Sequence, residues 1–112
     1  MEIEVKEMKP LEDGKHEGVI TRVEYRTEPF SYTDVFISVS KEGFELKYGC
    51  PTSAGTESKL MILLSAFTQI RAGMKVDPEK VLIGKKVTFI SMQEKTKKGI
   101  FNKIVDGSIK LA

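Results

Sequence analysis

The sequence offers few residues for covalent or metal chemistry. Cys50 is the only cysteine and His16 the only histidine among 112 residues, which excludes an internal disulfide and most zinc sites. The acidic residues lack the spacing of a metal-binding pair, and Gly55 is not followed by the Gly-Lys-Ser/Thr element of a phosphate-binding loop. The sequence therefore predicts a protein that is not an enzyme and needs no metal or cofactor.

Aromatic and cationic side chains offer a different chemistry, the binding of flat rings and of phosphate groups. Three aromatic residues lie close together in the sequence: Phe30, Tyr32 and Phe36. Three lysines crowd one short polar segment: Lys95, Lys97 and Lys98. An exposed aromatic ring can stack on a nucleobase, which contributes about 1–3 kcal/mol per base, and lysines can neutralise phosphates.

The charges are unevenly distributed along the chain. The formal net charge is only +2, but residues 1–14 carry five acids against two lysines, residues 15–84 carry nine charges of each sign, and residues 85–112 carry seven lysines against two acids. The last segment is therefore strongly cationic. A polyanionic partner is compatible with this distribution, although the whole-chain charge does not suggest one.

The length indicates one domain, and the single cysteine and single histidine indicate a reducing compartment. We expect residues 1–14 to form a leader, with a short strand around Ile3 and Val5, and residues 15–112 to form the domain. The longest apolar run, Leu60 to Leu64, is far shorter than the roughly 20 residues needed to cross a bilayer. The start of the chain lacks the apolar core of a signal peptide. These features predict a cytoplasmic protein without membrane association.

Alternating apolar and polar residues predict three consecutive strands over 17–26, 32–40 and 44–50. A strictly alternating first strand would have one face made of Val19, Thr21, Val23 and Tyr25, and another made of Ile20, Arg22, Glu24 and Arg26. On the second strand, the aliphatic face consists of Val35, Ile37 and Val39. If that face covers the core, Tyr32 and Phe36 point outward.

The second half of the chain changes period. Five apolar residues follow the spacing of one helical face: Leu60, Leu63, Leu64, Phe67 and Ile70. They predict a helix of about four turns with Thr56 as its N-cap and an end near Arg71 and Gly73. Asp77 and Pro78 predict one further helical turn, which ends before Gly84. Two strands follow over 85–92 and 99–105, and the tail at 108–112 is expected to extend the last one.

Three strands, a helix and two strands make an all-β domain with one main helix. This is the order of the OB-fold, a five-stranded Greek-key barrel in which the helix between the third and fourth strands covers one end. An open α+β sheet is the alternative. We favour the barrel because closure protects the edges of short strands.

Much of the chain resembles small OB-fold single-strand-binding proteins of phages and archaea. The similar stretches are GKHEGVITRVEYR, PFSYTDVFISV, CPTSAGTESKLMILLSAF, VDPEKVLIGKKVTF and KGIFNKIVDGSIK. The most specific parts are the helix start at 58–60 and the Asp-Pro-Glu approach to the fourth strand. The resemblance implies the barrel fold and the binding of single-stranded nucleic acid.

An OB-fold binds ligands on its second and third strands and on the loops between strands one and two and strands four and five. On this basis the candidate binding residues are Arg22, Arg26, Phe30, Tyr32, Phe36, Lys47, Lys95, Lys97, Lys98 and Lys103. Several have structural alternatives. Arg22 and Arg26 can form cross-strand ion pairs, Phe30 can cover a barrel end, and a bulge can turn Phe36 inward. We expect Tyr48 and Phe101 to lie in the core.

The sequence thus favours a non-catalytic protein that binds single-stranded DNA, in preference to RNA, with little sequence preference. Replication, recombination or repair is the expected setting, with proteins of those processes as further partners. A module that binds another protein is the main alternative. A nuclease is the third class, and it would require metal-dependent turnover.

Overall fold

The computed structural model describes residues 11–39, 44–53 and 55–112. The strand expected around Ile3 and Val5 and the connection at 41–43 lie outside these residues. The elements are β1 (Gly14–Arg26), β2 (Tyr32–Val39), β3 (Phe44–Pro51), α1 (Lys59–Ser65), α2 (Pro78–Leu82), β4 (Lys86–Thr96), β5 (Gly99–Ile104) and β6 (Lys110–Leu111).

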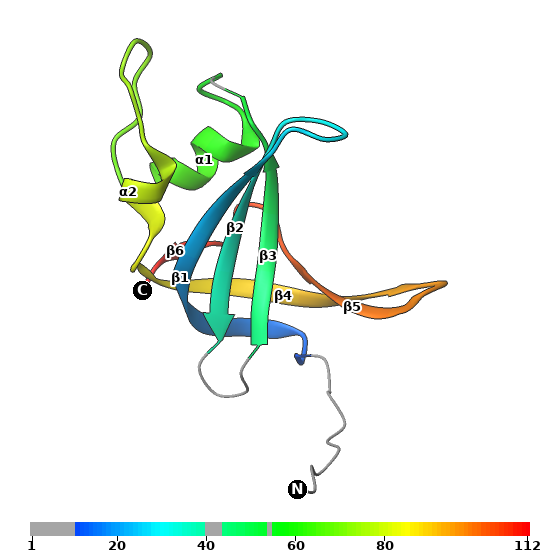
Figure 1. Ribbon diagram of the computed structural model, residues 1–112. Helices are drawn as coiled ribbons and strands as arrows, with labels where there is room; N and C mark the ends of the chain where they lie inside the picture. The colour runs from blue at the N-terminus through cyan, green and yellow to red at the C-terminus, as the bar shows by residue number, and fades with distance from the viewer. Residues whose placement is uncertain (1–10, 40–43, 54) are drawn as a thin grey trace, which may run out of the picture.

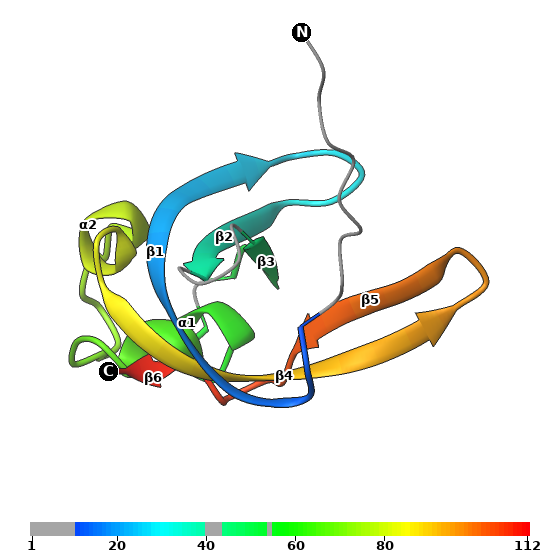
Figure 2. The ribbon, with the colours of Figure 1, turned by 90° about the horizontal axis from the view of Figure 1, so that it is seen from below.

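One antiparallel sheet runs through the molecule in the order β3-β2-β1-β4-β5, and β6 pairs with β4. The long strand β1 pairs with β4 through its first half and with β2 through its second half. It curls strongly as it passes from one partner to the other (Figure 2). The expectation of a mostly β protein is confirmed.

The sheet is not closed. β3 and β5 are the two ends of the hydrogen-bonded path, and they contact each other without a ladder between them in the described part of the chain. The tail at 108–112 does not extend β5, as the sequence suggested, but turns back so that Lys110 pairs with Thr88 of β4. The molecule is therefore a curved open sheet, and the predicted closure is not made by backbone hydrogen bonds.

A bulge in β1 breaks the strict alternation that the sequence predicted. The register against β2 shifts between Ile20 and Arg22, so that Ile20 and Val23 both point into the core. The expected faces are therefore wrong before the bulge, because Ile20 lies on the core face opposite Ile37 and Val19 lies on the outer face opposite Ser38. A bulge inserts one unpaired residue and reverses the parity beyond it. Beyond the bulge, Arg22, Glu24 and Arg26 therefore share the outer face of the sheet.

The core lies between the inner face of the sheet and α1. The aliphatic face of β2 is buried as predicted, together with Phe89 and Ile104 from the last strands. Leu60, Leu63 and Leu64 of α1 complete the core at one end. There α1 contacts β3, and α2 contacts both α1 and β1 (Figure 1). No helix in the described ranges is long and apolar enough to cross a membrane.

The main helix is shorter than its apolar spacing predicted. α1 begins after Ser58, whose Oγ accepts a hydrogen bond from the Met61 amide at 3.2 Å, so the predicted cap Thr56 is wrong. Phe67 and Ile70 still pack against the core from beyond the helix end. The helical spacing of the apolar residues therefore predicted correctly which residues are buried, but not how long the helix is.

The short helix α2 agrees with its sequence signals. Asp77 caps it by accepting a hydrogen bond from the Glu79 amide at 3.1 Å, and Pro78 occupies the first turn. Gly84 follows with a φ of 86°, a conformation that glycine adopts without strain. The predicted start and end of α2 are therefore confirmed.

Cys50 provides a test of the packing of β3. Its side chain is fully buried, and burial raises the pKa of the thiol to about 11. We expect iodoacetamide at about pH 8 to leave Cys50 unmodified in the native protein and to alkylate it rapidly in urea, because thiolate is the reactive form. Mass spectrometry measures the extent of labelling. Rapid labelling without urea would contradict the buried position.

Candidate nucleic-acid interface

The outer face of β1, β2 and β3 brings together five of the residues that the sequence singled out. They lie in two rows across the strands. One row contains Arg22, Phe36 and Lys47, and the other contains Arg26 and Tyr32. Both aromatic side chains point away from the core, as the alternation of β2 predicted, and both are half-buried on this face. The alternative in which a bulge turns Phe36 inward is excluded, because the bulge lies in β1.

Arg22 covers the ring of Phe36. The centre of its guanidinium lies 3.9 Å from the ring centroid. Its Nη1 donates a hydrogen bond to Oε1 of Glu24 at 2.6 Å, and its Nη2 donates to Oε1 of Glu45 at 2.6 Å. The hydrogen bond with Glu45 is the main cause of a raised pKa of Arg22. The arginine is therefore charged and held over the ring from two strands.

Arg26 covers Tyr32 in the same way, at 4.9 Å from the ring centroid. Its Nε donates to Oδ2 of Asp34 at 2.5 Å and its Nη2 donates to Oδ1 at 3.1 Å, a two-point contact. The carboxylate is buried, since Asp34 is only 2 % exposed. Gly49 lies opposite on β3, where a Cβ would come within 3.1 Å of Oδ1 of Asp34. Glycine thus leaves room for the buried carboxylate.

Cross-strand pairing was an open alternative for both arginines, and it is confirmed. The face carries three cations and three carboxylates in close register: Arg22, Arg26, Lys47, Glu24, Asp34 and Glu45. None of the three carboxylates is among the binding residues predicted from the sequence. The available signal was Asp34 itself, which lies between Tyr32 and Phe36 at strand spacing and so shares their face. Because the signs balance, this face alone does not attract a polyanion.

The cationic surface lies on the hairpin formed by β4 and β5. This hairpin extends from the body on the same side as the β1–β2 loop in both views (Figures 1 and 2). The loop carries Phe30, which is 70 % exposed and so does not cover an end of the sheet. The hairpin lysines are exposed and make no ion pair within the described ranges: Lys95, Lys97, Lys98 and Lys103.

The two faces of the hairpin differ. Lys95 pairs with Ile100 and belongs to the face that continues from the buried pair of Ser91 and Ile104. Lys103 pairs with Met92 and belongs to the opposite face. The register therefore places Lys103 of β5 and Lys95 of β4 on opposite faces of the hairpin.

Phe101 is the clearest error among the expected core residues. Tyr48 is buried as predicted, but Phe101 is 50 % exposed. Phe101 pairs with Glu94 on the β4–β5 hairpin, and this hairpin extends beyond the body of the molecule (Figure 2). The apolar character of a strand residue did not reveal that the strand extends past its core.

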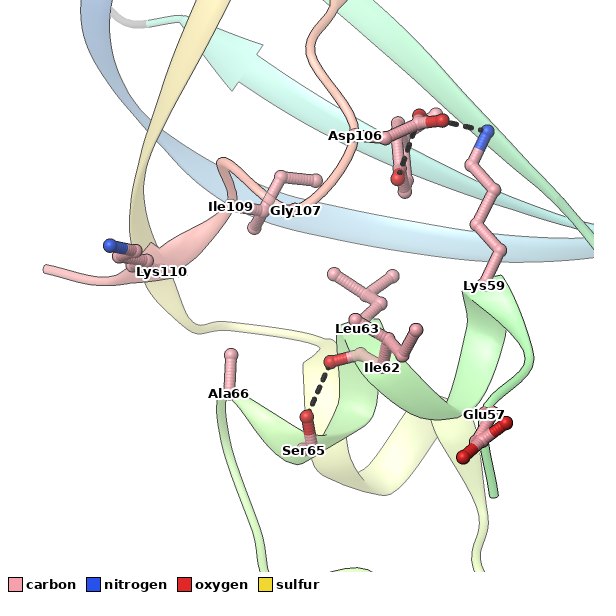
Figure 3. Close-up of a pocket in the computed structure, with 11 residues that line it drawn as sticks. Glu57, Lys59, Ile62, Leu63, Ser65, Ala66, Asp106, Gly107, Ile109 and Lys110 are labelled. Carbon is pink, nitrogen blue, oxygen red and sulfur yellow. Dashed lines mark hydrogen bonds and ion pairs between the residues drawn. The ribbon is translucent and has the colours of Figure 1, made fainter. Parts of the chain in front are cut away.

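A second feature, which the sequence did not reveal, is an apolar groove between α1 and the segment after β5 (Figure 3). Its volume is about 600 Å³, and Ile62, Leu63 and Ile109 contribute to its lining. At one end Asp106 accepts a hydrogen bond from Tyr48 Oη at 3.1 Å and pairs with Lys59 Nζ at 3.3 Å. These residues are distant in the sequence, so no local pattern connects them.

The ion pair in the groove predicts a small pH-dependent effect. Burial alone would raise the pKa of Asp106, but Lys59 and the Tyr48 hydroxyl lower it overall. A carboxylate with a lowered pKa stabilises the fold above its unfolded pKa of about 3.9, and this contribution is lost as the pH falls through the folded pKa. Asp106→Asn should therefore cost about 0.5 kcal/mol at pH 7, a small value because the pair is largely exposed. Urea unfolding at about pH 7 and pH 2.5 measures it; an equal cost at both values would contradict the ion pair.

The geometry defines a mostly β protein with one curved antiparallel sheet, an aromatic and arginine face, and a lysine-rich hairpin. No protein-family model matches the chain, and a search of curated proteins finds no match. No group of three or more potential metal ligands occurs in the part of the chain that the structure describes.

Proposed function

We propose that this protein is an OB-fold protein that binds single-stranded nucleic acid, DNA in preference to RNA, with little sequence preference. The strand order supports the fold. β1, β2 and β3 form a meander, β1 pairs with β4, β4 pairs with β5, and the helices lie between β3 and β4. This is the order of an OB-fold opened between its third and fifth strands, and β3 and β5 contact each other at that point.

The observation that carries the proposed activity is the combination of surfaces on one side of the molecule. The β1–β2 loop with its exposed Phe30 leads directly into Tyr32 on the outer face of β1, β2 and β3. The lysine-rich hairpin extends on the same side of the molecule as this loop. Unpaired bases need flat surfaces and phosphates need cations, and both are present there. A duplex offers its bases no such contact, because they are stacked and paired inside the helix.

The proposed mechanism divides between these surfaces. Lys95, Lys97 and Lys98 neutralise phosphates and release counterions, with Lys47 contributing from β3. Bases stack on Phe30 and on the outer face of β1, β2 and β3, where Arg22 covers Phe36 and Arg26 covers Tyr32. Lys103 lies on the other face of the hairpin and has no part in this mechanism. Replication, recombination and repair are the processes that expose such single strands.

Replacing Lys95, Lys97 and Lys98 together with alanine tests the electrostatic part of the proposal. Each phosphate contact on a single strand contributes about 0.7 to the slope of log K against log salt, so the slope should become shallower by about 2. Fluorescence anisotropy with labelled oligothymidine at several salt concentrations measures it. A matched variant with Lys75, Lys80 and Lys85 changed to alanine has the same net charge and should keep the slope. Equal slopes in both triple variants would contradict the proposed role of the hairpin.

A protein-binding module is the second candidate function, and the groove beside α1 favours it. Under this alternative, nucleic-acid binding is weak, and the hairpin variant barely changes it. Light scattering would then report a defined complex or oligomer. These outcomes differ from those of the first proposal in both measurements.

A further inference from the structure

The outermost groups over the two aromatic rings are guanidinium planes. Arg22 lies over Phe36 and Arg26 lies over Tyr32, at 3.9 and 4.9 Å from the ring centroids. The side chains of the two arginines remain 49 % and 41 % exposed, while the rings beneath are only half-exposed or less. A base that approaches this face therefore meets an arginine before it meets a ring.

Each guanidinium group already uses two of its five N–H donors on carboxylates. Arg22 uses Nη1 and Nη2 on two carboxylates, both at 2.6 Å. Arg26 uses Nε and Nη2 on Asp34, which is buried. A phosphate that approaches either arginine would also meet the negative charge of the carboxylate already bound to it. Stacking requires only the flat face of the guanidinium, and arginine planes are established surfaces for unpaired bases.

The two platforms are far enough apart to serve different bases. Tyr32 and Phe36 are four residues apart on β2, which is about 13 Å at strand spacing. One base is too thin to contact both, since stacked bases lie about 3.4 Å apart. The pair of Arg26 and Asp34 keeps the first platform in position, and Glu24 and Glu45 keep the second.

We propose that Arg22 and Arg26 stack on the bases of the bound strand, that Asp34 and Glu45 are positioning residues for them, and that the lysines make the phosphate contacts. This inference rests on the proposed function and adds a division of roles to it. The ligand it implies is a strand with unpaired bases. A strand that has the same phosphates but no bases should not respond to a change in either arginine.

The test uses two probes of equal length, labelled oligothymidine and an abasic strand. Arg22→Lys and Arg26→Lys keep the charge and remove the plane. Each should weaken oligothymidine binding about tenfold, which is within the range for one stacked base. The affinity for the abasic strand and the salt slope should not change. Melting curves of each variant confirm that the protein is folded at the assay temperature.

Glu45→Gln tests the positioning role against the opposite view, in which Glu45 competes with phosphate for Arg22. A positioning role predicts weaker oligothymidine binding and an unchanged abasic affinity. Competition predicts tighter binding of both probes and a steeper salt slope, and this result would overturn the inference. So would arginine variants that weaken both probes equally. A native protein that binds neither probe would instead overturn the proposed function itself.

Discussion

Replacing Arg26 with alanine is expected to lower the melting temperature by about 10 °C, which is a large effect for a domain of this length. The reason is the carboxylate that remains. Asp34 is 2 % exposed, and both of its oxygens accept hydrogen bonds from Arg26. Without the arginine, a charge would stay buried without a partner, which is the costly way to break an ion pair. The same variant also loses the platform over Tyr32, so its affinity for oligothymidine should fall.

A double variant separates the two causes. Arg26→Ala combined with Asp34→Asn removes the buried charge together with its partner, and it should recover most of the lost melting temperature. It should not recover the lost affinity, because the guanidinium plane is still absent. Circular dichroism during heating measures the first quantity and anisotropy the second. A double variant as unstable as Arg26→Ala would show that the buried charge is not the cause.

The second large effect is expected at Gly18, where β1 is packed against both of its neighbours. A Cβ at this position would lie 2.6 Å from Cγ2 of Ile37 and 2.8 Å from the carbonyl oxygen of Ser38. The oxygen belongs to the backbone of β2 and cannot rotate away. Gly18→Ala should therefore lower the free energy of unfolding by about 3 kcal/mol, at the upper end of typical overpacking costs.

Gly55→Ala is the matched control for this substitution. Among the described residues, a Cβ there meets only the Oγ of Ser53, at 3.9 Å, which is ordinary contact. The control should change the free energy of unfolding by less than about 1 kcal/mol. Urea unfolding of the two variants gives the comparison. If Gly18→Ala were as stable as Gly55→Ala, the close approach of β1 and β2 would be wrong.

The regular parts of the sheet were predictable because their signals are local. The alternation of β2 indicated which residues are buried and that Tyr32 and Phe36 point outward, and α2 followed from its cap and its proline. β1 was only partly predictable. Its bulge near Thr21 leaves no mark in a pattern of alternating residues, so two positions were assigned to the wrong face. The position of such a bulge depends on how the sheet curves, and the curvature arises from the packing of the whole sheet.

Most residues of the candidate site were predictable from the sequence, but the contacts between them were not. The arginines and aromatic residues were singled out separately, and the structure stacks them in pairs. Asp34 was overlooked because a charged residue in a strand usually faces solvent, whereas here an arginine from the neighbouring strand covers it. The exposure of Phe101 was missed because an apolar residue in a strand resembles a core residue. Its type does not show that the β4–β5 hairpin extends past the core.

A salt titration of binding to oligothymidine, with a duplex and an RNA strand measured in parallel, tests whether the protein binds single-stranded DNA through its lysines. Four lysines are assigned to phosphates: Lys47, Lys95, Lys97 and Lys98. With four phosphate contacts we expect a slope of log K against log salt of about −3 for oligothymidine, weaker binding of RNA, and little binding of the duplex. No change in anisotropy with oligothymidine at low salt and tens of micromolar protein would contradict it.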